Sequence, residues 1–261
     1  MRILFIGDIV GKPGRNALKT CLPRLVQEHE IDVVIANGEN SAGGSGITGV
    51  IADELFKNGV HIITLGDHTW DQKEIPSVLE REKRLLRPAN YEEDVPGRGS
   101  GVFQINGFCP PIAVLNLQGR TFMKEVANPF RVALREVEKL RKETSVIFVD
   151  FHAEATSEKI ALGRLLDGKV SAVIGTHTHV QTADEEIFPG GTAFMCDAGF
   201  TGGHESVIGR EIEPVLKRFM TGLPQRFEVA CHDIRLKGCL VVVDNETGRA
   251  IDIKRISEYV R

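Results

Sequence analysis

Two histidines, His177 and His179, lie two residues apart in the stretch "AVIGTHTHVQTAD" (172–184). The apolar residues just before them predict a buried strand. If the backbone stays extended beyond that strand, residues two apart point to the same side, so both imidazoles would face one target. Histidine is the commonest metal ligand in proteins, which favours a metal as that target. The alternative is a pair of solvated loop histidines.

Polar side chains also follow other predicted strands, at the point where each strand ends. They are Asp8 in "GDIVG", Glu39 and Asn40 in "NGENSAGGSG", Asp67 and His68 in "GDHTWD", and His152 in "DFHAEATSEK". Singly, each has an ordinary alternative, such as a helix cap for Asp8, loop surface for Glu39 or a core position for His152. Ligands of open α/β sheets bind outside the carboxyl ends of the strands, so five distant segments would deliver these groups to one edge. Their agreement in position and type indicates a single site.

The donor set of this predicted site is carboxylate, amide and imidazole, without thiolate. Such donors suit Fe, Mn, Zn or Ni, and seven ligands are too many for one ion. Two ions are therefore expected. A bridging carboxylate can hold two ions roughly 3.5–4 Å apart, a spacing that suits in-line displacement at phosphorus. Glu39 is the expected bridge.

Short apolar runs alternate with amphipathic segments along the chain. Buried strands are predicted at 2–7, 32–37, 61–66, 112–117, 145–150 and 171–176. Helices are predicted at 14–30 and 47–59, so the early chain is predicted to run β-α-β-α-β. Residues 227–256 alternate with a period of two around the turn "NETG", which predicts antiparallel strands near the C-terminus. We expect one domain over residues 1–261, with a Gly- and Pro-rich loop at 90–101 long enough to matter to a site.

The composition narrows the class of protein. A chain of 261 residues with 42% hydrophobic content can bury a full α/β core. With 36 acidic and 32 basic residues the net charge is −4, and no basic run interleaves with aromatics, so duplex nucleic acid is not an expected partner.

The cysteines and the apolar segments indicate in which cellular compartment the protein is expected. No C-x-x-C pair occurs, and reduced thiols are expected at Cys21, Cys109, Cys196, Cys231 and Cys239. Neither a secretory signal nor a stretch approaching 18 apolar residues is present, so we expect a cytoplasmic protein with no membrane partner. Homo-oligomer formation is left open.

The order of these motifs resembles the calcineurin-like metallophosphoesterases, whose pattern is D-x-H, G-D-x-x-D, G-N-H-[DE], H and G-H-x-H. The likeness is closer to a bacterial subfamily, the 2′,3′-cyclic-nucleotide 2′-phosphodiesterases. The stretches similar to its signatures are "RILFIGDIVGKPGR", "NGENSAGG", "HTWD", "RPANY", "NLQGRTFM", "DFHAEATSEK", "GTHTHVQTAD" and "DAGFTG". The resemblance implies an α/β fold, namely a four-layer α-β-β-α sandwich of two packed sheets.

The resemblance also implies roles for individual residues. One metal ion would be held by Asp8, Glu39, Asn40 and His179. A second would be held by Glu39, Asp67, His152 and His177. His68 would be the proton donor. Substrate contacts are expected in loops similar to those of the subfamily, although each could instead be structural, at Asn90, Gln118, Arg120, Thr201 and His204. The single tryptophan, Trp70, is expected in the core rather than as a base-stacking surface.

Two positions depart from the family pattern. The superfamily has a histidine two residues after the first aspartate, where this chain has Val10, and in the subfamily Asn40 supplies a ligand instead. The subfamily has "GNHTWD" where this chain reads "GDHTWD", so Asp67 stands where an asparagine is expected.

The expected function is dimetal-dependent hydrolysis of 2′,3′-cyclic nucleotides, with 3′,5′-cyclic nucleotides as further candidates. Two cations lower the pKa of a bridging water, whose hydroxide attacks phosphorus while His68 protonates the leaving oxygen. The cofactors would be two divalent or trivalent ions, with Fe or Mn favoured and Zn or Mg as alternatives. Two other functions stay open: a phosphomonoesterase or nucleotidase with the same dimetal centre, and a non-catalytic nucleotide-binding regulator.

Overall fold

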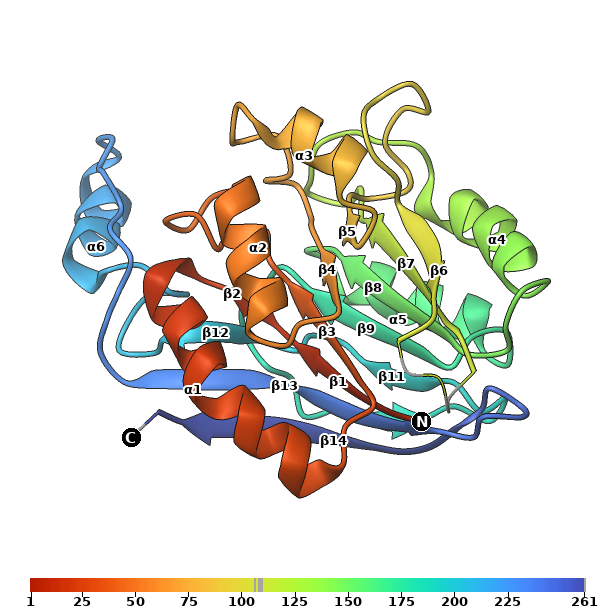
Figure 1. Ribbon diagram of the computed structural model, residues 1–261. Coiled ribbons are helices and arrows are strands. Elements are labelled where there is room, and N and C mark those ends of the chain that lie inside the picture. The colour runs from red at the N-terminus through yellow and green to blue at the C-terminus, as the bar shows by residue number, and fades with distance from the viewer. Residues whose placement is uncertain (106, 108–109, 261) are drawn as a thin grey trace.

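The computed structural model describes residues 1–105, 107 and 110–260, whose strands form two sheets (Figure 1). Within these residues the larger sheet has eight strands, with β14 (Ala250–Tyr259) beside β13. The other seven follow the order β2 (Asp8–Ile9), β12 (Phe200–Gly203), β13 (Ile234–Val243), β1 (Arg2–Ile6), β3 (Val33–Asn37), β4 (Ile62–Thr64) and β5 (Leu85–Leu86).

The smaller sheet has six strands in the described part of the chain. Their order is β10 (Glu186–Ile187), β11 (Ala193–Met195), β9 (Ala172–Thr176), β8 (Ile147–His152), β7 (Ile112–Gln118) and β6 (Ser100–Phe103).

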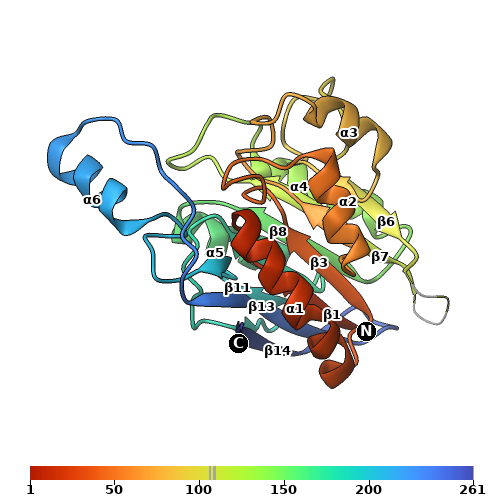
Figure 2. The same cartoon turned by 60° about the vertical axis from the view of Figure 1, so that its left-hand side comes forward.

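Helices cover the outer face of each sheet (Figures 1 and 2). The larger sheet packs against α1 (Gly11–His29), α2 (Gly49–Lys57) and α3 (Ile75–Arg81). The smaller sheet packs against α4 (Pro129–Leu140) and α5 (Thr156–Leu166), whereas α6 (Ile212–Thr221) stands apart from the sandwich.

A third apolar core lies between the two sheets. Phe5 of β1 and Phe148 of β8 meet there, with ring centroids 5.0 Å apart. The layers therefore run helix, sheet, sheet, helix, and the predicted four-layer α-β-β-α sandwich is confirmed. Burial of these apolar faces is the main force that holds the layers together.

All six predicted strands are present, with ends shifted by up to two residues. Helix α1 begins at Gly11, three residues before its predicted start, although "GKPG" has the composition of a loop. Proline is tolerated there because amides in the first helical turn have no partner within the helix. The prediction of an antiparallel C-terminal pair is correct, but β13 begins at Ile234 rather than near 227, because Asp233 has a left-handed backbone (φ 51°).

Four cysteines, Cys21, Cys196, Cys231 and Cys239, carry free thiols, and Cys109 lies outside the described residues. Among the described helices, none combines the length and the apolar character needed to cross a bilayer.

Parallel pairing brings the ends of several strands to one edge of the sandwich. β1, β3 and β4 are parallel neighbours in the larger sheet, and β7, β8 and β9 are parallel neighbours in the smaller one. The polar stretches singled out in the sequence therefore leave both sheets at the same edge, as expected for an α/β ligand site.

A buried ion pair lies next to this edge and connects it to α5. Lys159 Nζ on α5 donates to Asp197 Oδ2 at 2.8 Å, and both side chains are 1% exposed. The same carboxylate oxygen accepts hydrogen bonds from the amide and hydroxyl of Thr178 (3.0 and 2.8 Å). Asp197 thus links α5 to the turn that carries His177 and His179.

Lys159→Met is expected to lower the free energy of unfolding by about 3–5 kcal/mol, because it leaves Asp197 as an uncompensated buried charge. Urea unfolding followed by circular dichroism measures the change. The control Lys19→Met, at an exposed position on α1, should change stability by less than about 0.5 kcal/mol. A loss for Lys159→Met no larger than that of the control would contradict the role given to the pair.

Candidate metal centre

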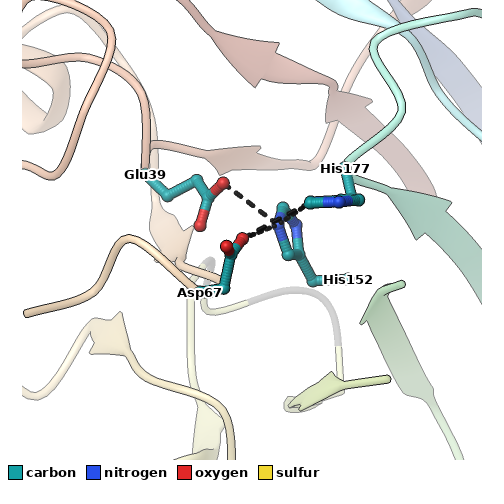
Figure 3. A group of neighbouring side chains, drawn as sticks. All are labelled: Glu39, Asp67, His152 and His177. Carbon is teal, nitrogen blue, oxygen red and sulfur yellow. Dashed lines mark hydrogen bonds and ion pairs between the residues drawn. The ribbon is translucent and has the colours of Figure 1, made fainter. Parts of the chain in front are cut away.

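Four side chains from both sheets form a tight cluster, which we call the acidic cluster: Glu39, Asp67, His152 and His177 (Figure 3). One ligand atom of each lies within 4.8 Å of the others. His152 is the centre of the group, and its Nε2 lies 3.0 Å from Glu39 Oε1, 3.1 Å from Asp67 Oδ1 and 3.0 Å from His177 Nδ1.

A second group adjoins the acidic cluster and consists of Asp8, Asn40 and His179. His179 Nε2 lies 3.2 Å from Asn40 Oδ1 and 3.8 Å from Asp8 Oδ1. Asp8 is fully buried, and its Oδ1 is a buried oxygen without a hydrogen-bond partner among the described residues. The two groups meet at His177, whose amide donates to Asp8 Oδ2 (3.2 Å).

His177 and His179 do not share one target, so the expectation of an extended backbone after β9 was wrong. Both residues have left-handed backbones, with φ of 97° and 64°, which turns His177 toward the acidic cluster and His179 toward Asn40. Such conformations cost about 1–3 kcal/mol each and persist only where the surroundings impose them. Here the bonds from Thr178 to buried Asp197 supply that restraint.

Hydrogen bonds determine which nitrogen of His152 carries a proton. The Thr176 hydroxyl donates to Asp150 Oδ1 (2.7 Å), so toward His152 it acts as an acceptor for the Nδ1 proton (2.9 Å). In the neutral ring Nε2 then keeps its lone pair, which faces the carboxylates of the acidic cluster.

The other two rings follow the same rule. His177 Nε2 faces Glu154 Oε2 at 3.1 Å and donates to it, which leaves the Nδ1 lone pair facing His152. His179 Nδ1 donates to the carbonyl of Ile208 (2.9 Å), which leaves the Nε2 lone pair facing Asn40 Oδ1. Each ring therefore presents a lone pair inward, and a carboxylate or carbonyl orients the opposite nitrogen, as is usual for metal-binding histidines.

The pKa shifts of His152, Asp8 and Asp67 reflect burial and the carboxylates gathered at this site. Burial alone would lower the pKa of His152, but Glu39 and Asp67 raise it well above its usual range. Without a cation a proton therefore occupies Nε2, and its lone pair becomes available when a cation displaces that proton. Burial raises the pKa of Asp8, despite the opposing effect of His179 and His152. Burial would also raise the pKa of Asp67, but hydrogen bonds to His152 and His177 hold it well below its usual range. Facing lone pairs, an orphaned carboxylate oxygen and hard N/O donors fit a bound cation.

The backbone approaches this cluster most closely at Gly66. A Cβ at this position would lie 2.2 Å from His152 Cδ2 and 2.3 Å from Glu39 Oε2. Glycine is therefore required by space rather than by an unusual backbone angle.

A recess of about 300 Å³ opens beside the cluster. Its lining includes Glu39, His177 and His179 together with His68, and Arg210 supplies a positive charge. His68 Nδ1 donates to Asp71 Oδ2 (2.7 Å), and Ser45 also donates to that carboxylate. The recess is thus next to the candidate ligands and contains the residue expected to donate a proton.

The residues expected to contact substrate are dispersed. Asn90 and Gln118 line a different recess beside Asp67, and Arg120 lines a third with Met123 and Glu158. The amide of Asn90 is used within the fold, since it donates to the carbonyls of Gln118 and Ala127 and accepts from the Gln118 amide.

The other two residues expected to contact substrate, Thr201 and His204, have partners within the fold. Trp70 does not lie where it was expected. Thr201 is buried and exchanges hydrogen bonds with Lys237, and His204 stacks on Phe200 at 4.2 Å. Trp70 is not a core residue, contrary to expectation, and is 38% exposed. It lies in a turn before α3, outside the apolar cores of the sandwich.

Sequence reasoning missed the residues that orient the candidate ligands. Glu154 and Asp71 had a signal, because they lie two and three residues after His152 and His68 in the same motifs. Asp150 sits inside a strand two residues before His152, where its role as acceptor for Thr64, Thr176 and Asn37 is visible only in the fold.

Comparison with known proteins identifies the relatives of this chain. Residues 4–256 match the family described as YmdB-like protein. The chain is 48% identical over 256 residues to a 2′,3′-cyclic-nucleotide 2′-phosphodiesterase of Bacillus subtilis, covering 98% of this chain and 96% of that protein. The chain belongs to the YmdB-like protein family. The resemblance to the bacterial phosphodiesterase subfamily is thereby confirmed, and with it the prediction of a phosphodiesterase enzyme.

Solved structures agree with the YmdB-like assignment. A structure described as a novel phosphatase from Mycoplasma pneumoniae superposes with a TM-score of 0.92 at 36% identity, covering 99% of this chain and 93% of that chain. A 5′-nucleotidase from Candida albicans shares the fold at a TM-score of 0.57 and 13% identity, over 98% of this chain and 51% of that chain. Family membership and the acidic cluster together support the use of a divalent metal by this YmdB-like chain.

Gly66→Ala is expected to weaken binding of Mn²⁺ at least about tenfold, because the added methyl group displaces His152 or Glu39. Isothermal titration of the metal-stripped protein measures the affinity. Gly107→Ala is the matched control, since a Cβ there meets no atom of the described residues within 4 Å. Equal Mn²⁺ affinity in the two variants would show that the close approach at Gly66 does not shape the centre.

Proposed function

We propose that this chain hydrolyses 2′,3′-cyclic nucleotides at a two-metal centre built from both sheets, with residues 1–261 acting as one domain. The single observation that carries the proposal is the set of inward-facing lone pairs, with His152 Nε2 within 3.1 Å of two carboxylates and of His177 Nδ1. The 48% identity to the Bacillus subtilis enzyme supports the substrate class. Cleavage at the 2′ oxygen would release a 3′-phosphate.

The donor groups divide between two ions in a simple way. Asp8, Asn40 and His179 would hold one, and Asp67, His152 and His177 would hold the other. Glu39 would contact both, because it belongs to the acidic cluster and is adjacent in sequence to Asn40. When bound, such ions polarise the phosphoryl oxygens and lower the pKa of a water held between them. Fe or Mn suits these hard N and O donors, and Zn or Mg is a weaker alternative.

Electrostatics explains why the substrate needs this arrangement. A phosphodiester is an anion, and Asp8, Glu39 and Asp67 would repel it if their charges stayed uncompensated. Arg210 is the cationic side chain in the recess, but its guanidinium donates to the carbonyls of Gly43 and Gly44. The chain's own side chains would therefore position the cations, whose positive charge would offset these carboxylates when an anionic substrate binds.

His68 has the surroundings of a proton donor. Asp71 accepts a hydrogen bond from its Nδ1 (2.7 Å) and orients the ring, so Nε2 is the nitrogen that would donate to the leaving 2′ oxygen. The residue lies in the recess and is half-exposed, so the ring can reach a substrate.

An activity panel tests the proposal. The Mn- or Fe-loaded protein is assayed with 2′,3′-cyclic AMP, 3′,5′-cyclic AMP, bis-p-nitrophenyl phosphate and p-nitrophenyl phosphate. We expect 2′,3′-cyclic AMP to give the highest kcat/KM and the product to be the 3′-phosphate. Preference for the monoester would instead indicate a phosphomonoesterase, and binding without turnover would indicate a regulator.

His68→Ala is expected to lower kcat for 2′,3′-cyclic AMP about 100- to 10,000-fold, the usual contribution of a general acid. The loss with bis-p-nitrophenyl phosphate should be less than about tenfold, because nitrophenolate leaves without protonation. Metal content should stay unchanged, and His232→Ala, at an exposed histidine, should match the wild type. Equal losses on both substrates would remove His68 from this role.

Asp67→Asn is expected to raise kcat/KM for a diester about fivefold at matched metal occupancy. The amide keeps the shape of the side chain and removes one negative charge from the approach of an anionic substrate. Even in bulk water, two unit charges 4 Å apart interact by about 1 kcal/mol, which corresponds to this factor. Kinetics across pH provide the measurement, and an unchanged or lower kcat/KM would contradict the charge argument.

A further inference from the structure

A second recess, of about 240 Å³, adjoins the acidic cluster at Asp67. We call it the aromatic recess, and its lining includes Asp67, Trp70, Tyr91, Gln118, Lys124 and Val126. The first recess is lined by Glu39 and His177 of the same cluster. The cluster therefore borders both recesses.

Two aromatic rings line this recess side by side. Trp70 and Tyr91 have centroids 5.8 Å apart with a tilt of 33°, and Trp70 is 38% exposed. The Tyr91 hydroxyl is occupied by the carbonyl of Gly66 (2.9 Å) and by Gln118 Oε1 (2.7 Å), so its ring is fixed. Trp70 thus presents a supported, flat apolar surface beside a highly polar centre.

Gln118 supports the Tyr91 side of the same recess. The side chain is fully buried at the end of β7. Its Oε1 accepts from Tyr91, whereas its Nε2 has a long contact of 3.4 Å with the carbonyl of Lys124. The buried amide therefore holds Tyr91 in place rather than presenting a donor to a ligand.

We propose that the aromatic recess binds the nucleobase of the substrate, with Trp70 as the stacking surface beside the fixed ring of Tyr91. This inference rests on the proposed function, since it places the phosphate at the acidic cluster and the ribose between the two recesses. The recess, at about 240 Å³, is smaller than the roughly 300–1,000 Å³ of sites for whole drug-sized molecules. Its size therefore suits one part of a nucleotide, such as the base. Stacking on an aromatic side chain accepts any base, because every base has a π-face.

The charges around the recess argue against a second phosphate as its occupant. Glu92 and Glu125 lie in its lining together with Asp67, whereas Lys124 is the one cation there among the described lining residues. An uncharged aromatic ring suits such a lining better than an anion does. A phosphodiester without a base would leave the exposed face of Trp70 unused.

Trp70 is the single tryptophan of the chain, so its fluorescence reports on this recess alone. The Mn-loaded wild-type protein is titrated with adenosine 3′-monophosphate and, separately, with ribose 5-phosphate. We expect saturable quenching by the nucleotide and none by the sugar phosphate. Unchanged emission at nucleotide concentrations that inhibit diester turnover would overturn the proposal.

Kinetics give a second, independent measurement. Trp70→Leu is expected to raise KM for 2′,3′-cyclic AMP about 5- to 150-fold, the factor that corresponds to about 1–3 kcal/mol of base stacking. KM for the base-free methyl riboside 2′,3′-cyclic phosphate should change less than twofold. Trp70→Phe should restore much of the affinity, and the control Phe219→Leu, at an exposed aromatic on α6, should have no effect.

The two substrates separate failure of this inference from failure of the proposed function. If the wild type turns over the base-free substrate efficiently, and Trp70→Leu has the same KM for 2′,3′-cyclic AMP as the wild type, base binding in the aromatic recess is refuted. The proposed diesterase activity would then still stand. No turnover of either substrate would refute the proposed function, and Trp70 quenching by the nucleotide would then still support a base-binding recess.

Discussion

Negative charge concentrated at one edge of the sandwich is the constraint on which the rest of this structure depends. Asp8, Glu39 and Asp67 gather at this edge, the first two buried, and three imidazoles adjoin them. Removing charges from water is costly unless opposite charge compensates it. The protein supplies little of that charge itself, so the arrangement is stable as a binding site for cations rather than as a set of side-chain ion pairs.

The surrounding shell keeps this unfavourable arrangement in place. Thr176 and Asp150 orient His152, Glu154 orients His177, and the Ile208 carbonyl orients His179. Each partner occupies the ring nitrogen that faces away from the centre. Rotation of a ring would break a hydrogen bond and leave a buried polar group unpaired, at a cost of about 1–3 kcal/mol. The free energy that holds the centre therefore comes largely from residues that would not touch a metal.

The sequence allowed the strands and the edge of the sheet to be predicted, because both depend on local patterns. Apolar β-branched runs mark buried strands, and parallel strands must end at one edge. The directions in which individual side chains point could not be predicted as well from the sequence. His177 and His179 diverge because of left-handed backbones that Asp197 imposes from a distant segment, and no local pattern encodes that contact. Trp70 was misplaced for a similar reason, since a turn rather than a helix carries it.

One short turn after β4 contributes residues to the acidic cluster and to both recesses. Asp67 enters the acidic cluster, His68 lines the first recess, Trp70 lines the aromatic recess, and Asp71 orients His68. Successive side chains of a tight turn diverge, so a few residues can reach three separate surroundings. The turn is fixed at its start by Gly66, whose close approach to His152 leaves no room for a side chain. A shift of this turn would therefore alter the acidic cluster and both recesses together, whereas substitutions confined to the tip of the Trp70 side chain would alter the aromatic recess alone.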